Sequence, residues 1–255
     1  MLSSIKWPLG YDKLVLNEVD STMAEASRRK SEIVKPTWIL AKHQTKGYGR
    51  RGRVWSSPRG NFSATLVIHI FEPPASLAMR SFVAALALFD SLVQVTKQPD
   101  LFSLKWPNDV LMDRRKVAGI LLESGGSSKS LDPLRIGIGV NLVSLPNLLR
   151  EEKKREILPI SLKDLSFDIS AEDFLVYLAV NFAYWETQLV ESGFPNIRKT
   201  WLGRSYKLGE AITVRTPSET HQGIFEMIDE SGNLVLKLED GSKIISAGDI
   251  YFEEV

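Results

Sequence analysis

The fold is decided by residues 105–123, which read KWPNDVLMDRRKVAGILLE. Val110–Met112 and Val117–Glu123 are short apolar runs on either side of the polar stretch 113–115. Apolar runs of this length with a polar turn between them predict two strands joined by a hairpin. The preceding Pro107 fixes a bend, so a third strand is expected to end just before it.

Lys116 lies where the second of these strands begins, next to the small residues Ala118 and Gly119. From there its ammonium group can reach a ligand that lies across the sheet. A fixed cation stabilises negative charge that grows on a phosphate or a carbonyl oxygen during acyl transfer. The alternative is that Lys116 is the last residue of an exposed basic turn.

Outward from this segment, strand-like and helical patterns alternate along the chain. Thr22 and Glu25 have the spacing of a capping box, and Ser170 with Asp173 has the pattern of a helix start. Strands are predicted at residues 13–19, 37–43, 62–70, 104–105 and 134–141, and helices at residues 22–30, 81–95 and 170–192.

The pattern changes after Trp201, where short apolar runs are separated by turn residues such as Asp240-Gly241. This pattern predicts a β-only module of about 50 residues, too small for an enzyme site of its own. We therefore expect a catalytic domain at residues 1–203 and a second domain at residues 204–255. The charged segment 147–159 is interpreted as a solvated loop or helix face.

Composition excludes several classes of protein. The net charge of +1 gives no overall signature of a nucleic-acid or membrane-surface protein, and the absence of cysteine excludes disulfides and thiolate chemistry. Three scattered histidines do not predict a metal site, and no stretch reaches the roughly 18 apolar residues of a membrane span. We expect a soluble cytoplasmic protein.

A local basic segment stands out against this balanced charge. Residues 33–71 contain seven Lys or Arg and no Asp or Glu, and at their centre KGYGRRGR (46–53) places four cations among three glycines. Glycines let backbone N–H groups approach an oxyanion, and guanidinium groups bind phosphate or carboxylate in bidentate fashion. The spacing is neither that of a Walker loop nor that of a dinucleotide fingerprint. The alternative is a basic surface loop that contacts nucleic acid.

Taken together, these stretches resemble the biotin protein ligases over essentially the whole chain. The resemblance implies an α+β fold: a mixed β-sheet packed with helices, of the class II synthetase and biotin/lipoate ligase type, followed by a small SH3-like β-barrel. The motifs that carry it are residues 20–22 (DST), 44–55, 105–109, 116–123 and 137–141 (GIGVN).

The resemblance also implies a reaction and roles for individual residues. Biotin would be activated with ATP to biotinyl-5′-AMP and then transferred to one lysine of a biotin carboxyl carrier protein. Lys116 and Arg50 would be catalytic, with Lys116 contacting both the biotin carboxyl and the α-phosphate. The expected biotin contacts are Ser21, Thr22, Gln44, Gly47, Arg50, Lys116 and Gly119, and the expected nucleotide contacts are Arg51, Arg53, Trp55, Asn108, Asn141 and Trp201.

Mg²⁺ is expected to accompany the triphosphate, but the sequence shows no dedicated metal ligands; Asp109 and Asn108 are the nearest candidates. Two residues depart from the family pattern. Tyr48 stands where many relatives have arginine, so that one phosphate ligand is absent or is supplied by Lys46 instead. Met23 stands where asparagine is frequent.

The partners follow from the same resemblance. The carrier would belong to acetyl-CoA carboxylase or another biotin-dependent carboxylase. Only about a dozen residues precede the first strand, so we expect no DNA-binding winged helix, no DNA partner and no membrane partner; a homodimer is left open. The alternatives are a lipoate or octanoate ligase or transferase of the same superfamily, and a non-catalytic biotin or nucleotide sensor.

Overall fold

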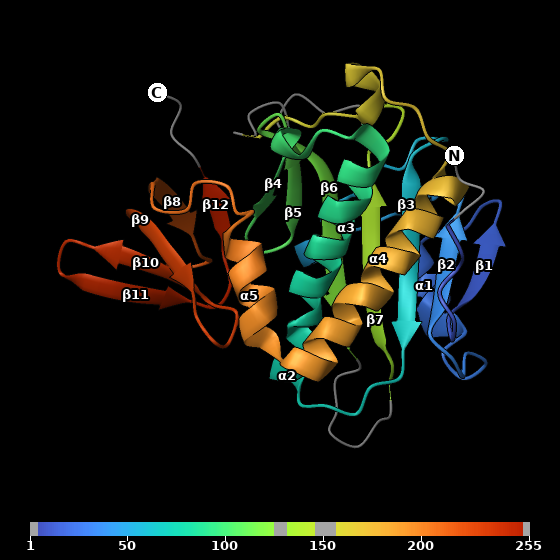
Figure 1. The fold of residues 1–255 in the computed structure, drawn as a ribbon, viewed down its shortest axis with the longest axis horizontal. Coiled ribbons are helices and arrows are strands. Elements are labelled where there is room, and N and C mark those ends of the chain that lie inside the picture. The colour runs from blue at the N-terminus through green and yellow to red at the C-terminus, as the bar shows by residue number, and fades with distance from the viewer. Residues whose placement is uncertain (1–4, 125–131, 146–156, 252–255) are drawn as a thin grey trace.

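The computed structural model describes residues 5–124, 132–145 and 157–251. A seven-stranded mixed sheet in the order β1-β2-β3-β7-β6-β5-β4 forms its centre (Figure 1). Only the edge pair β1 and β2 is parallel; the other neighbours are antiparallel. The strands are β1 (Asp12–Leu16), β2 (Thr37–Ala41), β3 (Phe62–Ile68), β4 (Phe102–Lys105), β5 (Asp109–Met112), β6 (Arg115–Glu123) and β7 (Leu134–Val140).

Helices α3 (Arg80–Thr96) and α4 (Ala171–Ser192) cover one face of this sheet (Figure 1). The predicted start of α4 is confirmed, since the Ser170 hydroxyl accepts a hydrogen bond from the Asp173 N–H. In the described residues, Pro74–Thr96 is long and apolar enough to cross a membrane, but most of it is buried. It comprises α2 (Pro74–Ala78) and α3, and α3 is a core helix of this fold.

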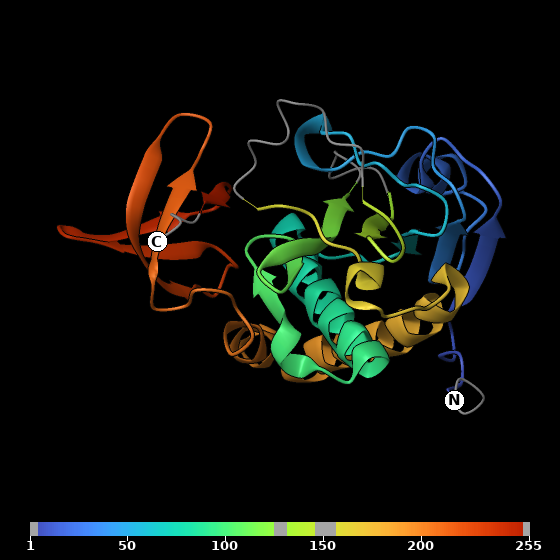
Figure 2. The ribbon, with the colours of Figure 1, turned by 90° about the horizontal axis from the view of Figure 1, so that it is seen from above.

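Aromatic and aliphatic side chains fill the layer between the sheet and these helices. Trp38 meets Phe182 edge-on at 5.8 Å between ring centroids, and Phe62 meets Phe174 in the same way at 5.1 Å. Because side chains alternate along a strand, the remaining residues of β2 and β3 face the other side of the sheet. There α1 (Thr22–Arg28) packs its Ala26 with a smaller apolar cluster, and that side also carries the loops between the first strands (Figure 2).

One detail of α1 differs from the prediction. The helix is present, but its N-cap is Ser21, which makes no side-chain capping bond. Thr22 instead donates its hydroxyl to Gln44, 22 residues away, and Glu25 pairs with Arg28 and Arg29. The capping box is therefore wrong, because a tertiary partner takes the hydroxyl that the local pattern assigned to the helix.

The C-terminal strands form a separate antiparallel sheet in the order β11-β10-β9-β8-β12 (Figure 2). It is open rather than closed into a barrel, yet it fits the expected SH3-like module. The strands of this C-terminal sheet are β8 (Ala211–Arg215), β9 (Thr220–Ile228), β10 (Leu234–Leu238), β11 (Gly241–Ile245) and β12 (Asp249–Tyr251). Helix α5 (Phe194–Leu202) precedes the sheet. Neither α5 nor β12 was predicted.

The mixed sheet with its helices and the small antiparallel sheet confirm the α+β fold class. The division at residues 203 and 204 falls between α5 and β8, and we keep 1–203 and 204–255 as the proposed domains. Most of the charged segment 147–159 lies outside the described residues.

Candidate active site

A cavity of about 560 Å³ opens on the face of the sheet opposite α3 and α4. Its floor consists of alternate residues of two paired strands, Gly119 and Leu121 of β6 and Gly137 and Gly139 of β7. The intervening residues of these strands point into the core on the other face. Three glycines in this position leave most of the floor without side chains, so a flat group can lie on it.

The indole ring of Trp55 lies directly over this floor. A Cβ added to Gly139 would come within 2.3 Å of the Trp55 ring, and one added to Gly119 would come within 3.3 Å of it. The Lys116 ammonium lies 5.6 Å from the centroid of the same ring. The predicted lysine and the predicted aromatic residue therefore meet on the glycine floor.

Four cations and two carboxylates line the cavity: Lys105, Lys116, Arg50 and Arg53, against Asp109 and Asp249. Lys116 Nζ is 2.6 Å from Asp109 Oδ1, and Arg50 donates a hydrogen bond to Asn108 Oδ1 at 3.2 Å. With cations in excess, the charged end of the cavity fits an anionic ligand.

Burial and pairing act in opposite directions on the groups of this end. Burial would raise the pKa of Asp109, but the charges of Lys116 and Lys105 outweigh it and hold that pKa below its ordinary value. Burial lowers the pKa of Lys105 and also that of Arg50. A nearby negative charge stabilises the charged forms of Lys105 and Arg50, and an incoming anion supplies such a charge.

The other end of the cavity is neutral and polar. Gln44 Oε1 accepts hydrogen bonds from the Thr22 backbone N–H at 2.7 Å and from the Thr22 hydroxyl at 3.0 Å. Thr22, Gln44 and the neighbouring Ser21 are at most 9% exposed, and all three line the cavity. Buried donors and acceptors at this end fit a small polar head group.

Two asparagines join the strands around the charged end. Asn108 donates to the Ile120 carbonyl at 2.7 Å, and Asn141 donates to the Ile160 carbonyl at 3.2 Å. Asn108 and Asn141, the two predicted nucleotide contacts, both line the cavity. Their hydrogen bonds hold the cavity wall together.

The structure brings ten of the predicted site residues to one cavity and leaves three outside its lining. Gly47 lies behind Gln44, where a Cβ would come within 2.8 Å of the Gln44 Nε2 atom. Arg51 points to Asp249, with 3.2 Å between the charged atoms. The ten in the lining are Ser21, Thr22, Gln44, Arg50, Arg53, Trp55, Asn108, Lys116, Gly119 and Asn141.

Trp201 requires a correction. The structure does not place it beside the cavity, since its side chain is 1% exposed and its ring packs edge-on against Phe82 at 5.4 Å. The apolar face of α5 binds this ring to α3, so Trp201 is a core residue.

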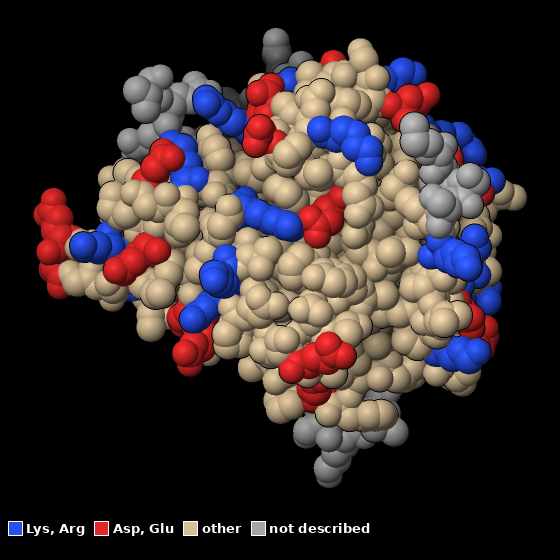
Figure 3. All heavy atoms as spheres, in the orientation of Figure 1, with Lys and Arg blue, Asp and Glu red and all other residues tan. Residues whose placement is uncertain are grey.

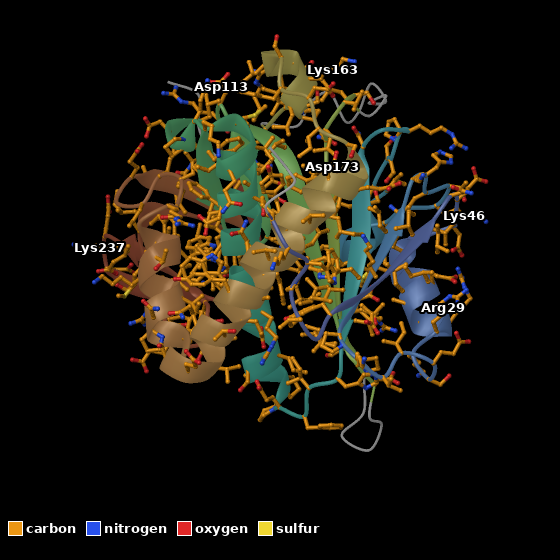
Figure 4. The ribbon with its side chains drawn as sticks, turned by 45° about the vertical axis from the view of Figure 1, so that its right-hand side comes forward. Arg29, Lys46, Asp113, Lys163, Asp173 and Lys237 are labelled. Atoms are coloured by element: carbon orange, nitrogen blue, oxygen red, sulfur yellow. The ribbon has the colours of Figure 1, made fainter. Side chains whose placement is uncertain are left out.

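Lys46, the candidate replacement for the arginine that many relatives have at position 48, lies outside the cavity lining. Lys46 is exposed at the periphery of the molecule, on the side of α1 (Figure 4), and does not line the cavity. Tyr48 does line it and donates a long hydrogen bond of 3.4 Å to Glu123. Met23, the second departure, lies beside Gly137, where a Cβ would come within 2.8 Å of its sulfur.

Asp249 is the functional residue that the sequence analysis missed. From β12 of the C-terminal sheet, its carboxylate contacts Arg53 at 2.5 Å and Arg51 at 3.2 Å. Burial would raise the pKa of Asp249, but the hydrogen bond from Arg53 and the charges of the nearby arginines together outweigh it, and the pKa lies below its ordinary value. The sequence offers one indication of such a residue. Segment 33–71 contains no Asp or Glu, so the carboxylates that pair with its cations have to come from other parts of the chain.

The described residues contain no group of three or more His, Asp or Glu side chains that could hold a metal ion. The cavity carboxylates Asp109 and Asp249 are each engaged by cations. These residues therefore do not fit a resident metal.

On the face that bears α3 and α4, positive and negative side chains are interspersed (Figure 3), so that face has no broad basic surface for nucleic acid.

Known proteins resemble this chain over almost its whole length. Residues 15–141 match the biotin/lipoate A/B protein ligase family, and residues 207–253 match the biotin protein ligase C-terminal domain. The chain is 42% identical to a biotin--[acetyl-CoA-carboxylase] ligase of Paracoccus denitrificans, over 93% of this chain and 99% of the relative. It is 28% identical to the bifunctional ligase/repressor BirA of Bacillus subtilis, over 92% of this chain and 71% of that relative. A solved biotin protein ligase from Aquifex aeolicus, in complex with biotin and ATP, has a TM-score of 0.77 at 28% identity, covering 94% of this chain and 97% of that one.

Proposed function

The chain belongs to the biotin protein ligase family, and from that premise we infer that it is an ATP-dependent ligase that activates biotin and transfers it to a carrier protein. One observation carries this inference. A single cavity joins a neutral hydrogen-bonding end at Thr22 and Gln44 to a cationic end at Lys116 and Arg50. Biotin has the matching layout, with a ureido ring at one end and a carboxylate at the other.

In the first half-reaction, an oxygen of the biotin carboxylate attacks the α-phosphorus of ATP. The bond from phosphorus to the bridging oxygen breaks, and pyrophosphate leaves. Two anions have to meet for this step. Lys116 and Arg50 offset their repulsion and bind the charge that builds on the phosphate in the transition state.

In the second half-reaction, a lysine amine of the carrier attacks the acyl carbon of biotinyl-5′-AMP. An amide forms, AMP leaves, and the amine loses a proton. The Gly47–Arg53 loop, closed over the adenylate, keeps water from attacking first. Arg51 and Arg53, which both pair with Asp249, would bind phosphate oxygens of the nucleotide.

The nucleotide would enter as its Mg²⁺ complex, with the metal as part of the substrate. The carrier would be the biotin carboxyl carrier protein of acetyl-CoA carboxylase, the carboxylase in the name of the Paracoccus relative, or that of another biotin-dependent carboxylase. We place the reaction in the cytoplasm.

The test is to incubate the chain with MgATP, a carrier domain and either biotin, lipoate or octanoate. Mass spectrometry of the carrier should show the mass gain of biotin alone, on one lysine. Labelling by lipoate or octanoate instead would favour the other branch of the superfamily. Biotin binding without ATP-dependent labelling would favour a non-catalytic sensor.

A further inference from the structure

Five buried side chains form one continuous set of hydrogen bonds behind the polar end of the cavity. Thr65 donates to the Thr22 hydroxyl at 2.8 Å, which donates to Gln44 Oε1 at 3.0 Å. Gln44 Nε2 donates to Ser57 at 3.0 Å, and the Ser57 and Ser63 hydroxyls are 2.9 Å apart. Each of the five is at most 9% exposed.

The direction of these bonds is fixed at one point. The Thr22 backbone N–H can only donate, so the Gln44 atom 2.7 Å from it must be the carbonyl oxygen. The Gln44 amide nitrogen then faces Ser57. The Thr22 hydroxyl hydrogen is committed to Gln44, and one Thr22 lone pair is filled by Thr65.

Two unused hydrogen-bonding positions remain after this assignment. Thr22 keeps one lone pair and Gln44 keeps one N–H, and both residues line the cavity. A ring that carries an N–H beside a C=O satisfies both positions. An alkyl chain end leaves both unpaired, which is the kind of mismatch that gives strong discrimination between substrates.

We propose that Thr65 is a positioning residue that fixes the Thr22 hydroxyl as an acceptor toward the substrate ring, and so helps select a cyclic urea. Thr65 is fully buried and does not line the cavity. It lies on β3 opposite Gly137, while Ser63 lies opposite Gly139, so both hydroxyls sit beside the glycine floor. The proposal rests on the function proposed above.

Thr65→Val removes the hydroxyl at nearly constant volume. One lone pair of Thr22 then has no donor, and Gln44 Oε1 alone still orients the Thr22 hydroxyl. Loss of a neutral hydrogen bond of this kind corresponds to roughly fivefold to tenfold weaker binding. We expect the dissociation constant and the KM for biotin to rise by that factor, while the KM for ATP and kcat stay within twofold.

The assays are calorimetric titration with biotin and biotin-dependent exchange between ATP and labelled pyrophosphate. Thr65→Ser, which keeps a hydroxyl, should restore most of the affinity. Thr96→Val is the matched control, because it removes another buried threonine hydroxyl, whose hydrogen bonds among the described residues lie within α3 and the residues just after it. Ser63→Ala shortens the network at its other end and should weaken biotin binding about twofold to threefold, which keeps the test valid if Thr65→Val unfolds.

Unchanged biotin affinity in Thr65→Val and Ser63→Ala, beside an active wild type, would overturn the role of Thr65 and leave the proposed function intact. Equal losses in the KM for biotin, the KM for ATP and kcat would show general damage and would also overturn it. A wild type without biotin-dependent exchange would overturn the proposed function and this proposal together.

Discussion

Removal of the Lys116 ammonium should slow biotin activation by orders of magnitude while the chain stays folded. The group lies 2.6 Å from Asp109 and 5.6 Å from the centroid of the Trp55 ring, at the charged end of the cavity. A unit charge about 4 Å from the reacting phosphate contributes about 4 kcal/mol at an effective dielectric constant of about 20. Lys116→Ala should therefore lower the rate of adenylate formation by about 10²-fold to 10³-fold.

The effect on stability should be much smaller. The Lys116 side chain is 31% exposed, and Asp109 keeps Lys105 at 3.9 Å. A partly exposed pair of this kind contributes about 1 kcal/mol or less, which lowers Tm by about 2–4 °C in a chain of this size. Thermal unfolding of the variant checks this.

Exchange between ATP and labelled pyrophosphate, at saturating biotin, measures the activation step. Lys46→Ala is the matched control, since Lys46 is a nearby exposed cation outside the cavity lining, and it should exchange like wild type. Exchange by Lys116→Ala within threefold of wild type would refute the role given to this lysine.

Three further outcomes are expected. Arg50→Gly should speed the release of biotinyl-5′-AMP about tenfold or more, because the variant lacks a charge-assisted hydrogen bond to the ligand; an unchanged dissociation rate in stopped flow would mean that the loop does not retain the adenylate. Asp249→Asn should lower Tm above about pH 5, and the difference from wild type should shrink as pH falls below about 4. Burial opposes ionisation, but the Arg53 hydrogen bond and the nearby arginine charges together keep the folded pKa of Asp249 lowered, so its contribution is present above the unfolded value near 4 and is lost as pH falls through the folded value. A constant Tm difference across this range would contradict it. Gly139→Ala should destabilise the chain by about 1–3 kcal/mol, since the new Cβ would meet the Trp55 ring at 2.3 Å, whereas Gly49→Ala meets nothing closer than 3.8 Å and should be neutral in denaturant unfolding; equal stabilities would show that Trp55 does not occupy the floor.

Local patterns sufficed for the elements that local physics determines. The strand at Phe62–Ile68 and the helix at Ala171–Ser192 were predicted because apolar runs, the Ser170 cap and the Gly193 stop are readable along the chain. Strand β12, only three residues long, exists because it pairs with β8. Helix α5 is nine residues long and begins with Phe194-Pro195, so its pattern was too short to detect.

The site divides in the same way. Lys116 was identified by its place at the start of a strand and Trp55 by the family resemblance, but the contact between them depends on the glycine floor of two paired strands. Asp249 is 196 residues from Arg53, and no local pattern connects them. Trp201 was predicted to contact the nucleotide because its residue type and position match a family aromatic. The packing of α5 instead directs its ring into the core.

The most direct test is a crystal structure of the chain with biotin and a non-hydrolysable ATP analogue. The account predicts the ureido ring between Thr22 and Gln44, the Lys116 ammonium within hydrogen-bonding distance of the biotin carboxylate and the α-phosphate, and Arg51 and Arg53 moved from Asp249 to phosphate. A ligand bound elsewhere, with Lys116 directed into solvent and residues 47–53 turned away from the cavity, would contradict it.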